Sequence, residues 1–206
     1  MTMMIVLCSS CGGKQDNSKT DASASPSPSA TAKTDAGTTD NKITFTIELE
    51  DGGIMKGELY PDVAPETVSN FVKLAKEGFY TGLIFHRVIP GFMIQGGGMD
   101  KDMNPKETAS IKGEFKTNGF DNELKHTRGV ISMARTQDPN SASSQFFIMH
   151  QDYPSLDGQY AAFGKITEGL DVVDRIAESE TTTFPELGMQ DVPVEPIIIK
   201  SITIDE

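Results

Sequence analysis

Residues 85–97 carry the clearest structural signal in the chain: Phe85-His86-Arg87-Val88-Ile89-Pro90-Gly91-Phe92-Met93-Ile94-Gln95-Gly96-Gly97. Apolar, β-branched and aromatic residues dominate both halves, which is typical of strands, and Pro90-Gly91 separates them. Successive side chains of a strand point to opposite faces, so Met93 and Gln95 share one face and Ile94 lies on the other. Alternation does not place Phe92 on the Met93 face, although Pro90-Gly91 can shift the register there. The stretch thus predicts two strands: Phe85–Ile89 and Met93–Gly96.

A second stretch, Ser143-Ser144-Gln145-Phe146-Phe147-Ile148, has the same two-faced pattern. Phe146 and Ile148 form the natural core face, and Gln145 and Phe147 point away from it. Together the two stretches predict an outer face on which Arg87 lies beside four side chains: Met93, Gln95, Gln145 and Phe147. Apolar side chains mixed with amides and one guanidinium suit a neutral peptide ligand, so we expect a binding site on this face.

Strand and helix patterns continue from Lys42 to the end of the chain. The other predicted elements are a helix that begins at Pro65 and ends at Gly78, a helix over 170–177, and strands over 43–49, 54–59, 130–133, 145–149, 162–166 and 197–204. About eight strands that are not regularly interleaved with helices argue against a parallel sheet. We therefore predict a mainly β fold with a closed antiparallel barrel, because closure removes the edge strands. A β-sandwich that carries helices is the alternative that the pattern leaves open.

The first 41 residues differ in composition from the rest. Residues 1–11 carry no charge, and residues 12–41 contain Ser, Thr, Ala, Asp, Lys and Gly but no large apolar side chain. Such a segment cannot bury enough surface to offset the entropy lost on ordering. We therefore expect a disordered polar linker over 12–41, followed by a folded domain over 42–206.

The linker is preceded by Cys8-Ser9-Ser10-Cys11. With Gly12-Gly13 behind it, this pattern resembles a lipoprotein processing site, in which 1–11 is a truncated signal segment and Cys11 is the lipidated residue. The apolar run is short and no Lys or Arg precedes it, so a start upstream of Met1 would restore a full signal. We expect an extracytoplasmic protein, lipid-anchored to the bacterial cell membrane, with a cytoplasmic protein as the alternative. A redox role for Cys8 and Cys11 is weaker, because both lie outside the predicted fold.

Composition narrows the possible functions. With 18 Lys+Arg against 30 Asp+Glu the net charge is -12, which repels a polyanion, so no nucleic-acid partner is expected. Three scattered histidines, and no cysteine after residue 41, predict no metal and no cofactor. No Gly-x-Ser-x-Gly elbow is present, and Gly96-Gly97-Gly98 lacks the Lys of a phosphate loop, so we expect a bend after a strand there. Nothing indicates an oligomer, and we expect a monomer.

At these residues the chain resembles the cyclophilin family of peptidyl-prolyl cis-trans isomerases. The resemblance runs from Ile43 to Ile204 and rests on residues 85–97 with three further stretches in family order: Lys125-His126-Thr127-Arg128-Gly129-Val130-Ile131-Ser132-Met133-Ala134, Ser144-Gln145-Phe146-Phe147-Ile148, and Leu156-Asp157-Gly158-Gln159-Tyr160-Ala161-Ala162-Phe163-Gly164. It implies a closed eight-stranded antiparallel β-barrel capped by two α-helices, with the active groove on its outer face. It also implies that proline-containing polypeptides bind there and that X–Pro rotation is accelerated, here on secreted or surface proteins.

The resemblance implies which residues form the groove. Arg87 falls on the family's catalytic arginine, Gln95 is expected to accept a hydrogen bond from its guanidinium, and Phe92 completes the catalytic set. The positions that fall on substrate contacts are Met93, Ala134, Arg135, Gln145, Phe147, Leu156 and Tyr160. Many members have a tryptophan or another ring where this chain has Ser155, and that tryptophan binds cyclosporin, so we expect weak sensitivity to the drug.

The residue types suit this reaction. An X–Pro amide rotates across a barrier of ~18–20 kcal/mol, and no covalent bond need break. The nitrogen of the twisted amide regains a lone pair, which a fixed donor such as Arg87 stabilises. The alternative is a non-catalytic module that binds proline segments. Retention of both Arg87 and Gln95 favours the enzyme, because binding alone does not need the arginine.

Overall fold

The computed structural model describes residues 41–205, so the predicted signal segment, the lipidation site at Cys11 and nearly all of the predicted linker lie outside the described residues. Two α-helices are present in this range: α1 (Pro65–Lys76) and α2 (Leu170–Ala177). The strands are β1 (Ile43–Leu49), β2 (Ile54–Leu59), β3 (Leu83–Ile89), β4 (Met93–Asp100), β5 (Val130–Met133), β6 (Phe146–Met149), β7 (Ala162–Glu168), β8 (Thr181–Phe184), β9 (Met189–Pro193) and β10 (Ile199–Asp205). Short 3-10 turns lie at Lys116–Asn118, Pro154–Leu156 and Pro185–Leu187. None of the helices between residues 41 and 205 is long and apolar enough to cross a membrane.

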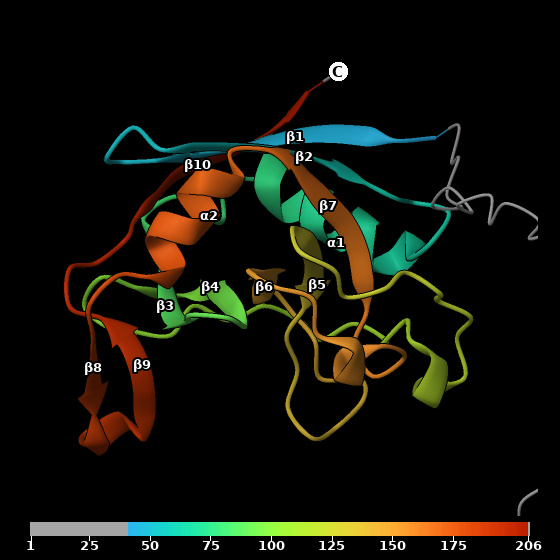
Figure 1. Cartoon of the computed structure of the whole chain (residues 1–206). Coiled ribbons are helices and arrows are strands. Elements are labelled where there is room, and N and C mark those ends of the chain that lie inside the picture. Colours follow the sequence, from blue (N-terminus) through green and yellow to red (C-terminus); the bar gives the residue numbers. More distant parts are fainter. Residues whose placement is uncertain (1–40, 206) are drawn as a thin grey trace, which may run out of the picture. The chain divides into compact units, whose positions relative to one another are not determined.

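Eight of these strands form one curved antiparallel sheet in the order β10-β1-β2-β7-β5-β6-β4-β3 (Figure 1). The predicted closed barrel is wrong: the sheet is an open half-barrel whose edges are β10 and β3. Between these edges the described residues form a single isolated bridge, Ile84 with Ile198, and backbone hydrogen bonds from Gly82 and Phe85. Pro196, just before β10, lacks the backbone N–H that would extend this pairing.

The core lies inside the curve of the sheet, around Phe71 of α1. The ring centroid of Phe71 lies 5.7 Å from that of Phe45, 5.3 Å from Tyr80, 5.6 Å from Phe146 and 5.3 Å from Phe163. All five side chains are almost fully buried. Edge-on and tilted ring pairs of this kind are favourable beyond the apolar area that they bury. The aromatic cluster therefore fixes α1 against β1, β6 and β7.

The N-terminus of α1 is capped from a distant part of the chain. Ala64 at the N-cap has no side chain that could do so. Instead the carboxylate of Glu114, 3% exposed, accepts hydrogen bonds from the backbone N–H groups of Glu66 at 3.0 Å and Thr67 at 2.8 Å. An anion at this end of a helix satisfies otherwise unpaired donors and interacts favourably with the helix dipole.

The strand β4 is longer than predicted. It runs through Gly96-Gly97-Gly98 to Asp100, where the sequence predicted a bend. Gly97 has φ 84, a left-handed conformation that favours glycine. A Cβ atom on Gly98 would lie 2.4 Å from Cγ of Gln145, so only glycine leaves space for that side chain to lie across the strand. The glycines therefore shape the surface beside the predicted groove.

The hairpin formed by β8 and β9 was not predicted. Its two strands form a separate small sheet, and Val192 of β9 is 2% exposed. The hairpin extends away from the main sheet on the side of β3, at the lower left of Figure 1. This position brings β9 next to the residues expected to form the groove.

Candidate active site

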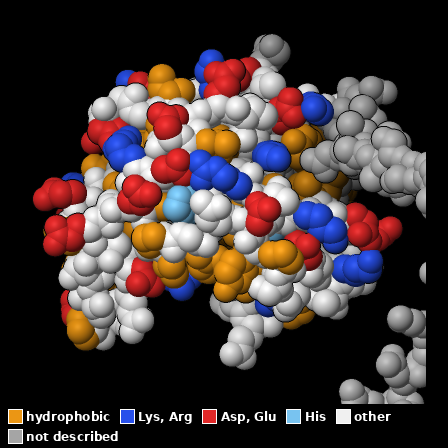
Figure 2. Space-filling model, viewed as in Figure 1, with side chains coloured by type: hydrophobic (Ala, Val, Ile, Leu, Met, Phe, Trp, Pro, Cys, Tyr) orange, Lys and Arg blue, Asp and Glu red, His pale blue; other side chains and the backbone are white. Residues whose placement is uncertain are grey.

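A second apolar cluster lies on the outer face of the sheet, apart from the main core. Its buried members are Met93, Val130, Phe147, Met149 and Ala162, and Ile89, Phe92, Leu124, Ala134, Leu156 and Tyr160 pack against them. Ile94, Phe146 and Ile148 belong to the main core, which confirms the alternation predicted along both strands. Figure 2 shows hydrophobic side chains gathered below the middle of this view, between the hairpin and the loops at the lower right.

Phe92 reaches this cluster because of the turn before β4. The N–H of Phe92 donates to the carbonyl of Ile89 at 3.0 Å, and Gly91 has φ 77. Since Phe92 precedes the first strand residue, the alternation along β4 does not determine its direction. The turn itself is held from outside: the N–H of Gly91 donates to Nδ1 of His150 at 2.8 Å, and Nε2 of that ring lies 3.1 Å from Asp174 of α2.

Nine of the ten predicted groove residues line one pocket of 140 Å³. They are Arg87, Phe92, Met93, Gln95, Ala134, Arg135, Phe147, Leu156 and Tyr160. Met93 and Phe147 are 2% and 5% exposed. This volume equals the liquid volume of about four or five waters, which suits one small ring rather than a whole peptide.

The tenth residue, Gln145, lies next to this pocket rather than in its lining. Nε2 of Gln95 donates to Oε1 of Gln145 at 2.9 Å. The predicted hydrogen bond from Arg87 to Gln95 is absent from the contacts of the described residues, although the two are cross-strand partners in β3 and β4. Gln95 therefore pairs with the other amide instead of with the guanidinium.

Arg87 pairs instead with Asp191 of β9, a residue that sequence reasoning did not find. Its Nε lies 3.8 Å from Oδ2 of Asp191, and the two side chains are 42% and 41% exposed. Asp191 has φ 59, a conformation that Asp and Asn tolerate better than most other residues. The carboxylate leaves the two terminal nitrogens of the guanidinium as further donors.

Two of the predicted substrate-contact residues, Arg135 and Tyr160, contact each other. The guanidinium of Arg135 lies over the rings of Tyr160 and Phe115, with its carbon 4.7 Å and 5.0 Å from their centroids. It also donates to the carbonyl of Gln159 from Nε at 3.1 Å and from a terminal nitrogen at 2.9 Å. These contacts fix one wall of the pocket, because cation–π and hydrogen-bond contacts hold both side chains in place.

A buried polar network supports the floor of the pocket. The ring of His126 stacks on Phe147 at 6.0 Å, its Nδ1 lies 3.2 Å from Asp157, and its Nε2 lies 3.1 Å from Oγ of Ser132. Burial lowers the pKa of His126, so the ring is neutral at neutral pH. The order Ser–His–Asp matches that of a hydrolytic triad, but Ser132 is 0% exposed and no substrate carbonyl can reach it.

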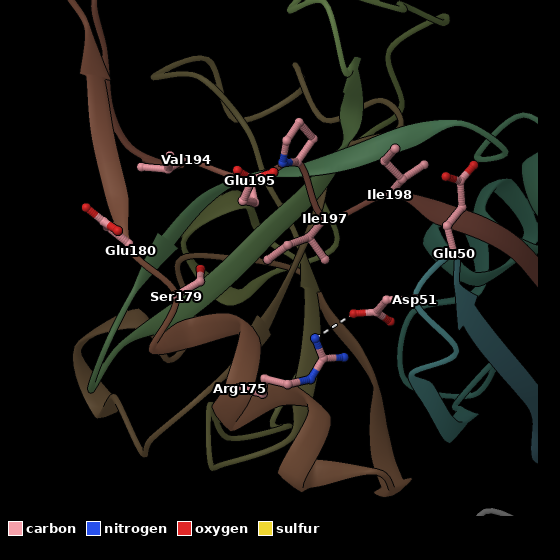
Figure 3. A pocket seen from close by; sticks show the side chains of 10 residues that line it. Glu50, Asp51, Arg175, Ser179, Glu180, Val194, Glu195, Ile197 and Ile198 are labelled. Carbon is pink, nitrogen blue, oxygen red and sulfur yellow. Dashed lines mark hydrogen bonds and ion pairs between the residues drawn. The ribbon is translucent and has the colours of Figure 1, made fainter.

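A larger cavity lies elsewhere. It has a volume of 710 Å³ and is lined by Glu50, Asp51, Arg175, Ser179, Glu180, Val194, Glu195, Pro196, Ile197 and Ile198 (Figure 3). Arg175 donates to Asp51 and thereby lowers the pKa of that carboxyl group. None of the predicted groove residues lines this cavity. Its carboxylates outnumber its one guanidinium, so it does not suit a neutral proline segment.

Residues 41–205 contain no group of three His, Cys, Asp or Glu that could hold a metal ion. What they do contain is a curved antiparallel sheet with a small pocket on its outer face, where apolar side chains lie beside Gln95 and the guanidinium groups of Arg87 and Arg135. This combination defines a class of β proteins that bind a neutral segment of polypeptide at a surface groove.

Comparisons with known proteins give the family. A family model described as cyclophilin type peptidyl-prolyl cis-trans isomerase/CLD matches residues 44–204. The chain is 48% identical over 159 residues to a peptidyl-prolyl cis-trans isomerase of Acinetobacter baylyi, which covers 74% of this chain and 80% of the relative. It is 46% identical over 157 residues to peptidyl-prolyl cis-trans isomerase B of Escherichia coli, with 71% and 91% covered.

A solved structure agrees with the sequence relatives. The crystal structure of a Cryptosporidium parvum cyclophilin type peptidyl-prolyl cis-trans isomerase superposes with a TM-score of 0.66 at 30% identity, covering 81% of this chain and 99% of that one. A second structure of the same protein was determined in the presence of the dipeptide Ala-Pro. The chain belongs to the cyclophilin-type peptidyl-prolyl cis-trans isomerases and is an enzyme of that reaction class.

Proposed function

We propose that this enzyme isomerises X–Pro bonds in polypeptide segments laid across the 140 Å³ pocket, with Arg87 as the catalytic residue. The observation that carries this proposal is that the guanidinium of Arg87 borders the pocket beside the apolar side chains of Phe92, Met93 and Phe147. Arg135 also lines the pocket, but its donors are already used by the backbone carbonyls of Gln159 and Thr136. The proline ring would occupy the apolar floor. Its nitrogen would then face the donors of Arg87.

The reaction needs no proton transfer and no covalent intermediate. When the amide twists, its nitrogen loses conjugation and regains a lone pair, which a terminal N–H of Arg87 stabilises more than it stabilises the planar amide. The dry pocket disfavours the more polar planar form. Because one charged hydrogen bond contributes only ~1.5–3 kcal/mol, exclusion of water and fixing of the backbone must supply the rest of the acceleration.

In this proposal Asp191 positions the guanidinium of Arg87, and Ala134 and Arg135 position the substrate. Asp191 holds the Nε side of Arg87, which leaves the terminal nitrogens for the substrate. The N–H of Ala134 already donates to the carbonyl of Gln145 at 2.9 Å, so any backbone contact from Ala134 to the substrate comes from its carbonyl. Leu156 and Tyr160 close the pocket, and Gln145 orients Gln95.

The experiment that separates catalysis from binding is exchange spectroscopy on a short X–Pro peptide mixed with the full chain. Cis and trans signals that exchange faster in the presence of the protein support the enzyme. Signals that shift on binding without faster exchange would make the groove a binding module and would refute the role given to Arg87. The same peptide with Ala in place of Pro is the control, because it lacks a populated cis form.

We further propose that the enzyme acts on secreted or surface proteins, as a monomer attached to the bacterial cell membrane by a lipid on Cys11. The support comes from the sequence, in which Cys11 follows two serines and precedes Gly12 and a polar segment. Metabolic labelling with a fatty acid, followed by membrane fractionation, tests this against a cytoplasmic location. Label on the wild type but not on Cys11→Ser supports the anchor, and an unlabelled wild type in the soluble fraction contradicts it.

A further inference from the structure

The β8–β9 hairpin forms one wall of a second cavity beside Arg87. This cavity has a volume of 440 Å³. One side consists of His86, Arg87, Gln95, Met99 and Gln145, and the hairpin contributes Leu187, Gly188, Met189, Gln190 and Asp191. Arg87 and Gln95 also line the proline pocket, so the two cavities meet at these two side chains. A polypeptide whose proline occupied the smaller pocket would therefore have this cavity next to it.

The lining mixes apolar with polar side chains: Met99, Leu187 and Met189 lie beside His86, Gln95, Gln145 and Gln190. Its two charged side chains, Arg87 and Asp191, neutralise each other as an ion pair. Met99, Met189 and Leu187 supply flexible or exposed apolar surface, and Leu187 is 50% exposed. Hydrophobic side chains are exposed at the tip of the hairpin, at the lower left of Figure 2. Methionine adapts its shape to different apolar partners, which favours a site that accepts several large side chains.

The hairpin is also held firmly enough to serve as a wall. Its strands pair at Thr181 with Pro193 and at Thr182 with Val192, and Val192 is buried. The N–H of Val194 donates to the carbonyl of Glu180 at 2.9 Å and closes the base of the hairpin. The cavity is therefore bounded by paired backbone on the hairpin side and by the main sheet on the other.

We propose that this cavity is a subsite for a large apolar side chain of the same polypeptide whose proline occupies the adjacent pocket. The proposal rests on the proposed function and extends it, because it makes the β8–β9 hairpin a specificity element that selects residues flanking the X–Pro bond. An unfolded client exposes such apolar residues near its prolines. A charged flanking residue gains nothing there, because Arg87 and Asp191 are already paired.

The test is a set of short peptides that contain one X–Pro bond and carry Leu or Gly at each flanking position in turn. For the full wild-type chain we expect kcat/KM to be about fivefold to tenfold higher with Leu than with Gly at one of these positions, as for partial burial of one large apolar side chain. In the double variant Leu187→Ser/Met189→Ser this ratio should fall below about twofold. Val194→Ser is the matched control, because Val194 is 47% exposed and lies in the other cavity, so the ratio should stay at the wild-type value.

Four results would overturn either the subsite or the proposed function, and they can be told apart. A wild type with no preference at any flanking position, or a preference that survives in the double variant, overturns the subsite. If no peptide is isomerised, the proposed function fails, and the Leu-to-Gly ratio of dissociation constants from calorimetry then tests the subsite. Nuclear Overhauser contacts between the Leu methyls of a bound peptide and the methyls of Met99 or Met189 test the subsite in the wild type, whatever the stability of the variant. Their absence from a bound Leu peptide overturns it as well.

Discussion

Replacing Asp191 by Asn should slow isomerisation without weakening substrate binding. The carboxylate lies 3.8 Å from Nε of Arg87, and the two side chains are 41% and 42% exposed. An exposed ion pair of this kind contributes ~0.2–1 kcal/mol. If this energy holds the guanidinium where the twisted amide needs it, kcat falls by about 1.4-fold to fivefold while KM hardly changes. Asn keeps the shape of Asp and tolerates the same left-handed backbone, so the variant removes the charge alone.

The assay is isomerisation of a short X–Pro peptide by the full chain at low and at high salt. The screening length falls from about 30 Å at 0.01 M to about 3 Å at 1 M, so the rates of wild type and variant should converge as salt is added. Asp51→Asn is the matched control, because it removes a carboxylate that pairs with Arg175 away from the groove. A kcat for Asp191→Asn that equals or exceeds the wild type at low salt would refute the reasoning. So would a difference that salt does not reduce.

Three further predictions concern the stability of the fold that carries the site. Phe71→Ala should lower the free energy of unfolding in urea by ~3–5 kcal/mol, because it empties the centre of the aromatic cluster, and a loss below about 1 kcal/mol would contradict that placement. Glu114→Gln should cost ~1 kcal/mol through the weakened cap of α1, whereas the exposed Glu107→Gln should cost less than about 0.5 kcal/mol; equal effects would argue against the cap. Burial lowers the pKa of His86 from 6.5 to about 4, so the unfolded chain binds more protons between these values. The neutral ring therefore makes its full contribution to the free energy of unfolding above pH 6.5. About 3 kcal/mol of this free energy is lost as the pH falls from 6.5 toward 4. His86→Gln should remove that part of the pH dependence in urea titrations, and an unchanged slope would contradict it.

The outer face could be predicted from residue alternation because the physics there is local. Phe146 and Ile148 had to face the core, and the strand period then placed Phe147 on the opposite face. The same reasoning separated Met93 from Ile94. Leu156 and Tyr160 lie outside any strand, so no periodicity places them, and only the family resemblance connected them with the groove.

The contacts that the sequence did not predict join residues that are far apart along the chain. Glu114 caps a helix 47 and 48 residues earlier, and Asp191 reaches Arg87 from a hairpin near the end of the chain. Neither contact has a local sequence pattern, because the residues around a carboxylate do not show whether it caps a distant helix or faces water. The hairpin itself had a signal: Thr181-Thr182-Thr183 favours a strand, and Pro185 and Gly188 mark a turn after it.

The predicted closure of the barrel was wrong for a related reason, since closure also depends on contacts between residues far apart along the chain. A strand count of about eight is compatible with a closed barrel, but closure requires an unbroken ladder between the first and last strands of the sheet. Pro196 removes a donor at that seam, where the described residues form one isolated bridge, Ile84 with Ile198. The number of strands was therefore informative, whereas the pairing at the edges depended on single residues.

The most direct test of the account compares two arginines that are similarly exposed and that each form an ion pair with one aspartate. Arg87 is 42% exposed beside Asp191, and Arg175 is 50% exposed beside Asp51. Loss of one charged hydrogen bond in the twisted state predicts that Arg87→Ala lowers kcat/KM on an X–Pro peptide by about 10-fold to 150-fold. Arg175→Ala should stay at the wild-type rate. A folded Arg87→Ala enzyme that isomerises as fast as the wild type would contradict the central claim.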